Sequence, residues 1–107
     1  MTSANRALFT LVQNLKIAAE AFGPNQGRPV LLAHGGGQTR HAWQACGKTL
    51  GENGYYALAV DLRGHGESDY PADPALYSEA LTVGDMLALL DLVGAKKAIV
   101  AGLSLGG

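Results

Sequence analysis

Three short apolar blocks, each followed by turn-forming residues, limit what this chain can fold into. The blocks cover residues 30–33, 55–60 and 98–103, and the first is a continuous apolar run between turn signals. Such runs are typical of parallel strands that are buried on both faces of a sheet. Helical patterns separate the blocks. The order strand, helix, strand, helix, strand predicts an α/β fold with a mostly parallel sheet and flanking helices, joined by right-handed crossovers.

The first helical pattern begins near Thr39, a residue type that favours the N-cap position. Trp43, Cys46 and Leu50 recur at a spacing that places them on one helix face, and Asn-Gly at 53–54 is a stop signal. We therefore expect an amphipathic helix in which Cys46 is buried by packing and takes no part in chemistry.

The second helical pattern begins at Thr82, because Thr82 and Asp85 have the spacing of a capping box. Gly94 marks its end. The apolar face of this predicted helix consists of Val83, Met86, Leu87, Leu90 and Val93.

Length, charge and cysteine content exclude several classes of protein. With 107 residues the chain is one domain or part of one. Eight basic and nine acidic residues give a net charge of −1 without any run of like charge, so we expect no nucleic-acid partner. The single cysteine forms no internal disulfide, and no Cys/His cluster has metal-ligand spacing, so we expect no metal. No stretch approaches the roughly 18 apolar residues of a membrane span, so we expect a soluble, cytoplasmic protein without membrane contact.

Two glycine-containing segments partly match nucleotide-binding motifs. Residues 47–49 read Gly-Lys-Thr, as at the end of a P-loop, but Ala42 stands where the earlier glycine is required. The glycines at 35–37 follow a predicted strand, but Arg40 stands where a dinucleotide-binding fingerprint has its third glycine. We therefore expect no nucleotide, NAD or other cofactor.

A GxSxG motif, Gly102-Leu103-Ser104-Leu105-Gly106, directly follows the third predicted strand. A serine on a sharp strand-to-helix turn presents its hydroxyl outward as a nucleophile, and small flanking residues let the backbone pack closely. The backbone N–H of Leu105 would then point at the developing oxyanion. The alternative is a glycine-rich turn whose serine has no chemical role.

A second glycine segment, His34-Gly35-Gly36-Gly37, follows the first predicted strand. Such a loop can turn a backbone N–H toward the same oxyanion, and Gly36 is the candidate donor. His34, Gly35 and Gly37 are candidates to line the site, and we expect His34 to hydrogen-bond the loop rather than transfer protons. The alternative is a flexible strand-to-helix connection.

Together, residues 34–38, 61–69 and 102–107 resemble the N-terminal half of an α/β-hydrolase, in the order that the family uses. The resemblance implies that Ser104 is the nucleophile, and that Leu105 and Gly36 are the oxyanion donors. It also implies an antiparallel hairpin at residues 7–12 and 16–22, although local propensity at 13–22 favours a helix. In the 61–69 loop, it favours hydrogen-bonding rather than catalytic roles for Arg63, His65, Ser68 and Asp69.

The acid and base of the triad follow the serine in this family, whereas the chain stops at Gly107. Residues 1–107 therefore correspond to a partial α/β-hydrolase domain without the later strands. We also considered whether a residue before Ser104 could replace the missing base or acid. His34, His41 and His65 are in loops expected on the same side of the sheet as Ser104, but none is at the position of the family's base. Asp91 is expected at the opposite end of the sheet.

The leading hypothesis is a serine hydrolase that acts on a small-molecule ester or related acyl substrate through an acyl-enzyme. Epoxide hydrolases and haloalkane dehalogenases of this fold use an aspartate as the nucleophile, so Ser104 argues against both chemistries. The alternative is a catalytically incomplete fragment or half-domain that needs the missing C-terminal part or a partner chain. Its last strand would lie at the sheet edge, where self-association is possible.

Overall fold

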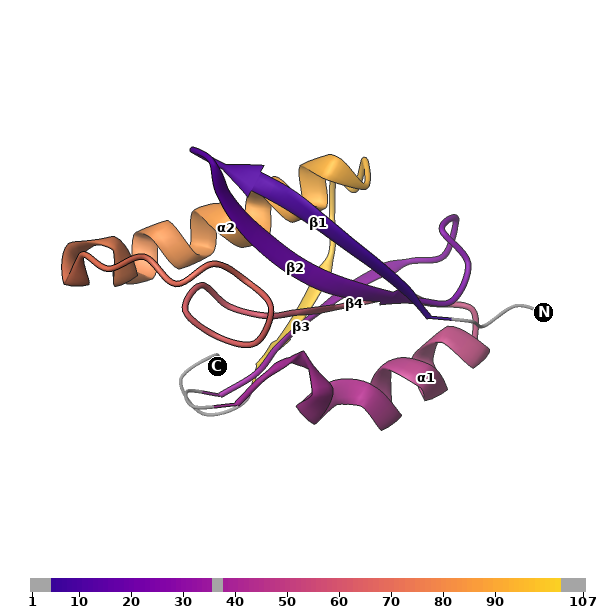
Figure 1. Ribbon diagram of the computed structural model, residues 1–107. Helices are drawn as coiled ribbons and strands as arrows, with labels where there is room; N and C mark the ends of the chain where they lie inside the picture. The colour runs from indigo at the N-terminus through magenta and orange to yellow at the C-terminus, as the bar shows by residue number, and fades with distance from the viewer. Residues whose placement is uncertain (1–4, 36–37, 103–107) are drawn as a thin grey trace.

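A mixed five-stranded sheet forms the centre of the protein (Figure 1). The computed structural model describes residues 5–35 and 38–102. The strand order is β1-β2-β4-β3-β5, and β3 pairs in parallel with both β4 and β5. Among the described strands, β2 runs antiparallel to both of its neighbours, and the remaining strands share one direction. The predicted α/β class is therefore confirmed. The strand bounds are β1 Arg6–Val12, β2 Leu15–Phe22, β3 Pro29–Ala33, β4 Tyr56–Val60 and β5 Ile99–Gly102.

The N-terminal hairpin implied by the family resemblance is confirmed. β1 and β2 pair from Arg6↔Ala21 to Val12↔Leu15. The two turn residues between the strands, Gln13 and Asn14, have φ of 51° and 69°, as a tight turn that follows the twist of a hairpin requires. β2 lies between two strands, so tertiary pairing overrides the local helical propensity of this segment.

Two α-helices cover opposite faces of the sheet, α1 (Gln44–Glu52) and α2 (Glu79–Leu92) (Figure 1). Short 3₁₀ turns, η1 (Arg40–Trp43) and η2 (Pro74–Tyr77), precede them. The core is accordingly divided in two. On the α2 side it contains Ile17, Ala19, Ala21, Leu31, Ala33, Tyr56, Leu58, Val60 and Leu89. On the α1 side it contains Phe22, Val30, Leu32, Ala57 and Ala59, with Trp43 and Leu50 packed against them.

The prediction that Cys46 is buried is wrong, because its side chain is exposed. Glycines bring α1 onto the sheet: a Cβ at Gly47 would lie 2.7 Å from the Phe22 ring, and one at Gly51 would lie 2.7 Å from the backbone nitrogen of Gly23. This contact turns the helix so that the buried stripe runs through the glycines. Cys46 falls outside that stripe.

Replacement of Gly51 by alanine is expected to destabilise the fold by about 1–3 kcal/mol, because the new methyl group meets backbone that cannot rotate away. Gly84 in α2 is the matched control. A Cβ there meets nothing within 4 Å, so Gly84→Ala should instead stabilise the helix by up to about 1 kcal/mol. Urea unfolding measures both. Equal effects of the two substitutions would contradict the close approach of α1.

α2 begins one turn earlier than the sequence pattern predicts. Ser78 is its N-cap, with Oγ accepting from the backbone N–H of Leu81 at 3.2 Å. Thr82 lies inside the first turn and donates to the Ser78 carbonyl, and Asp85 is buried rather than part of a cap. The predicted stop at Gly94 is confirmed by its φ of 75° directly after the Val93 C-cap.

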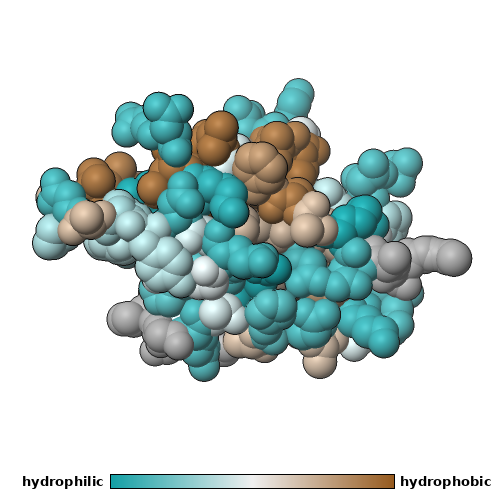
Figure 2. Space-filling model, in the orientation of Figure 1, coloured by the Kyte–Doolittle hydropathy of each residue, from teal (hydrophilic) through white to brown (hydrophobic). Residues whose placement is uncertain are grey.

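Hydrophobic residues gather on the side of the molecule where Figure 1 draws β1 and α2, as Figure 2 shows. Phe9 and Leu11 of β1 and Val83, Leu87 and Leu92 of α2 are all exposed. α2 therefore carries apolar residues on more than the face that it packs on the sheet.

No helix in the described part of the chain is long and apolar enough to cross a membrane.

Candidate active site

The carboxyl ends of β3, β4 and β5 lie side by side at one edge of the sheet. Ala33, the last residue of β3, is in register with Val60 of β4 and with Gly102 of β5. The glycine loop that follows His34 and the GxSxG motif that begins at Gly102 therefore start from neighbouring strands. Carboxyl-end loops of adjacent parallel strands are where α/β proteins place their ligands.

Several of the proposed site residues lie outside the described residues: Gly36, Gly37, Ser104 and Leu105. The strained turn at Ser104 and the convergence of the two backbone N–H donors therefore remain predictions. The structure places their flanks, His34 and Gly35 on one side and Gly102 on the other.

His34 ties the start of the glycine loop to the loop after β4. Its ring is fully buried, and Nε2 accepts the backbone N–H of Leu62 at 3.0 Å. Because Nε2 accepts, Nδ1 carries the proton and donates to the Gly35 carbonyl at 2.8 Å. Both ring nitrogens are thus engaged by backbone, which is the loop-binding role predicted for His34. The His65 ring lies beside it, 4.9 Å between centroids.

Burial lowers the pKa of His34, against the opposing effect of its hydrogen bond to the Gly35 carbonyl. With a folded-state pKa below the ordinary value of about 6.5, the unfolded chain binds the proton first. The stability that neutral His34 contributes is therefore complete above the unfolded pKa and is lost as the pH falls through the folded pKa.

The free energy of unfolding is thus expected to decrease as the pH is lowered from about 7.5 to about 5.5. Urea midpoints at a series of pH values measure this. His34→Gln removes the titrating ring, so its midpoint should change less over the same range. An equal pH dependence in both proteins would assign the effect to other groups.

The loop after β4 folds around the Asp61 carboxylate. This carboxylate accepts the backbone N–H groups of Arg40 at 2.7 Å and Glu67 at 3.0 Å, and it pairs with the Arg40 guanidinium. Gly66 has a φ of +52°, and a Cβ there would lie 2.4 Å from the carboxylate. The glycine is therefore required for the loop to close over Asp61.

The same loop extends the pairing of β2 beyond the end of β4. The Ala18 N–H donates to Ser68 Oγ at 2.8 Å, while the Ala18 carbonyl accepts the Asp61 N–H at 2.9 Å. The Lys16 N–H donates to Asp69 Oδ2 at 2.8 Å, and the Lys16 carbonyl accepts the Asp69 N–H at 2.8 Å. Ser68 and Asp69 are thus hydrogen-bonding residues of the loop, as the resemblance suggests.

Arg63 anchors the loop to α2 through a buried bidentate ion pair. Its Nε and Nη2 donate to the two carboxylate oxygens of Asp85 at 2.7 and 2.6 Å, and Nη1 donates to the Leu76 carbonyl at 2.6 Å. The hydrogen bonds that Arg63 donates to Asp85 raise the pKa of Arg63. This pair is not predicted from the sequence. Asp85 lies one turn before Leu89 on the buried face of α2, whereas Val83 and Leu87 of the face predicted from the sequence are exposed, so the helical pattern gives no signal for the pair.

Arg40 is the second buried cation that the sequence analysis misses. It lies directly after the glycine loop, is 8% exposed, and pairs with Asp61 and Glu67. Burial opposes its charge, but hydrogen bonds and ion pairs with Glu67 and Asp61 raise its pKa overall.

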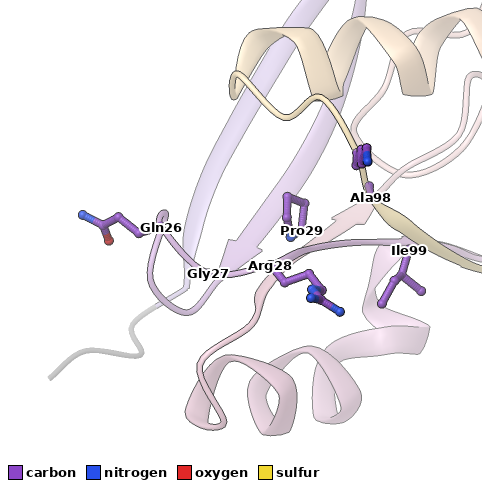
Figure 3. A pocket seen from close by; sticks show the side chains of 7 residues that line it. Gln26, Gly27, Arg28, Pro29, Ala98 and Ile99 are labelled. Carbon is purple, nitrogen blue, oxygen red and sulfur yellow. The ribbon is translucent and has the colours of Figure 1, made fainter.

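A surface hollow of about 460 Å³ lies at the opposite end of the strands from these loops (Figure 3). It lies at the amino ends of β3 and β5, away from the loops described above, so it is not the candidate site. Its lining residues are Gln26, Gly27, Arg28, Pro29, Lys97, Ala98 and Ile99.

Within residues 5–35 and 38–102, no group of three His, Cys, Asp or Glu side chains is placed to hold a metal ion.

A family model described as alpha/beta hydrolase fold matches residues 28–107. The chain belongs to this family. Among curated relatives of this α/β-hydrolase chain, an epoxide hydrolase of Caballeronia sordidicola is 35% identical over 89 residues, covering 83% of the chain and 26% of the relative. An esterase of Mycobacterium tuberculosis is 40% identical over 96 residues, covering 90% of the chain and 30% of the relative.

Solved structures agree with this family assignment. Epoxide hydrolase A from Mycobacterium thermoresistibile superimposes with a TM-score of 0.91 at 27% identity, over 96% of this chain and 32% of that one. An epoxide hydrolase from Vigna radiata gives a TM-score of 0.88 at 28% identity, over 95% of this chain and 32% of that one. The α/β-hydrolase chain thus spans between a quarter and a third of the length of these relatives.

Proposed function

We propose that this chain supplies the nucleophile part of a serine hydrolase that acts on an ester or related acyl substrate through an acyl-enzyme. The register of β3 with β5 carries the proposal, because it brings the glycine loop and the start of the GxSxG motif to one sheet edge. A nucleophile and an oxyanion donor must lie this close to act on one carbonyl.

In the proposed mechanism, the Ser104 hydroxyl attacks the substrate carbonyl carbon and its proton passes to a base. The backbone N–H groups of Gly36 and Leu105 stabilise the oxyanion of the tetrahedral intermediate. Collapse of the intermediate expels the alcohol, which takes up the proton, and leaves Ser104 acylated. Water then attacks the acyl-enzyme, and the acid is released with the serine hydroxyl restored. A region of the protein outside residues 1–107 would supply the base and the acid that orients it.

Epoxide hydrolysis is the competing activity, because several similar proteins carry that name. The residue at the nucleophile position favours the esterase-like assignment. Opening an epoxide through a covalent intermediate, as the aspartate-dependent members of this fold do, leaves an ester of the nucleophile that water then hydrolyses. A serine would instead leave an unreactive ether. The similarity to the esterase of Mycobacterium tuberculosis supports the same conclusion.

A chimera tests this assignment. The chain replaces the matching 96-residue segment of that esterase, so that the remaining part of the esterase completes the domain. We expect the folded chimera to hydrolyse a short activated ester and to leave an aryl epoxide intact. Epoxide opening, or a folded chimera inactive on both substrates, would overturn the proposal. Circular dichroism and a cooperative unfolding transition establish that the chimera is folded.

Residues 1–107 by themselves are expected to turn over the activated ester no faster than their Ser104→Ala variant. Serine is a weak nucleophile at neutral pH without an adjacent, oriented base. A colorimetric ester assay at matched concentrations measures the difference. Robust turnover that depends on Ser104 would overturn the hypothesis of an incomplete fragment and would point to His34, His41 or His65 as a substitute base.

The open edge of β5 favours a second candidate, a half-domain that pairs with a second copy of this chain. In the described sheet β5 is the terminal strand, and Ile99 and Val100 are 49% and 56% exposed. Unpaired backbone groups beside apolar side chains promote strand pairing between molecules. Light scattering of wild type and Val100→Lys tests this: a dimer that the lysine disrupts supports it, and a concentration-independent monomer or an unaffected dimer overturns it.

A further inference from the structure

We propose that Arg40 is a positioning residue that holds the loop after β3 against the loop after β4. The inference rests on the proposed function only for its catalytic consequence, since the first of these loops carries the proposed Gly36 donor.

The Asp61 carboxylate binds Arg40 twice. One oxygen accepts the backbone N–H of Arg40 at 2.7 Å, and the other pairs with the guanidinium. The Asp61 side chain is 0% exposed and that of Arg40 is 9% exposed, so neither charge has water as a substitute partner. The backbone contact fixes the main chain where the glycine loop ends, and the guanidinium holds the Asp61 carboxylate in place to accept it.

One guanidinium pairs with three carboxylates, two from the loop after β4 and one from β2. Nη1 of Arg40 pairs with Asp61, directly after β4. Nη2 pairs with Glu67 at 2.7 Å, and Nε lies 3.4 Å from Glu20 of β2. Without Arg40, three carboxylates would converge with no cation between them. The Glu67 carboxylate is 69% exposed and can turn to water, but Asp61 would stay buried without a counter-ion, so the cation is needed for the arrangement and not only for its own packing.

The other end of the glycine loop is held by the same partner loop, through the Leu62 N–H that His34 accepts. Arg40 and His34 thus bind successive residues, Asp61 and Leu62, from the two ends of one segment. The placement of that segment relative to the sheet edge depends on both anchors. His34 bonds only to backbone groups, whereas Arg40 also binds carboxylates through its guanidinium, which a substitution removes while the Arg40 backbone contact stays in place.

Amide hydrogen exchange of the ¹⁵N-labelled chain tests the proposal. The Gln38 N–H, which donates to the Gly35 carbonyl, reports on the glycine loop, and the Glu67 N–H, which donates to Asp61, reports on its partner. In Arg40→Met both should exchange at least about tenfold faster, while Leu58 in the centre of β4 is unchanged. The matched control is Arg28→Met, which removes an exposed charge at the opposite end of β3 and should change none of the three.

Unchanged exchange at Gln38 and Glu67 would overturn the proposal. Equal acceleration at Leu58 would also overturn it, because that result describes general destabilisation. If Arg40→Met does not fold, Arg40→Lys decides: a lysine keeps the charge but not the planar fork, so intermediate exchange is expected and wild-type exchange contradicts the role. None of these rates depends on catalysis, so an inactive Ser104 would overturn the proposed function and leave this inference standing.

Discussion

Replacement of Ser104 by alanine in the active chimera is expected to lower ester turnover by about 10⁴-fold or more. The nucleophile and its base act as one unit, so loss of the hydroxyl removes the covalent route and leaves only the contributions of the oxyanion donors and substrate binding. Because alanine leaves the pocket open, KM should change much less than kcat. Steady-state kinetics on the activated ester separates the two constants.

Ser78→Ala is the matched control for this substitution. Ser78 is exposed and caps α2, so its loss should cost about 1 kcal/mol of stability and leave kcat unchanged. Retention of more than about a tenth of the turnover in Ser104→Ala would show that another group is the nucleophile.

Replacement of Asp85 by alanine is expected to destabilise the chain by about 3–5 kcal/mol, the largest stability effect among the described side chains that we consider. Asp85 is 1% exposed and Arg63 is 5% exposed, so the substitution leaves a buried guanidinium without its counter-ion. For a small domain this is a large share of the total stability. Urea unfolding monitored by circular dichroism measures the loss.

Two comparisons isolate the ion pair in that measurement. Asp91→Ala removes an exposed carboxylate from the same helix and should change stability by no more than about 0.5 kcal/mol. The double substitution Arg63→Met with Asp85→Leu removes both charges and should recover most of the lost stability. If the double variant is as unstable as Asp85→Ala, packing rather than the unpaired charge accounts for the cost.

The fold could be predicted from the sequence where burial alone decides the structure. The apolar runs at 30–33 and 55–60 become β3 and β4, because a strand covered on both faces leaves little choice of residue. The hairpin could be predicted only from the family resemblance, since local propensity at residues 13–22 favours a helix and pairing with β1 and β4 makes the segment a strand. Cys46 is wrongly predicted because a glycine contact, and not hydrophobicity, sets the rotation of α1.

The edge that carries the candidate site could be predicted from motif order and strand direction, but its supporting ion pairs could not. Arg40 pairs with a residue 21 positions away, and Arg63 with one 22 positions away. No periodicity within a helix or strand encodes such a partner. Asp85 shows the difficulty most clearly, because the local capping pattern accounts for an acidic residue there before any tertiary contact is considered.

The loop after β4 also affects the order in which the chain folds. Its contacts with β2 close loops of 53 residues between Lys16 and Asp69 and of 50 residues between Ala18 and Ser68, whereas the β1–β2 turn closes over two residues. Long closures carry a larger entropic cost and form after local ones. We therefore expect the end of β2 nearest the hairpin turn to pair with β1 early. We expect it to gain its second partner only when β4 has joined the sheet and the loop after β4 has docked.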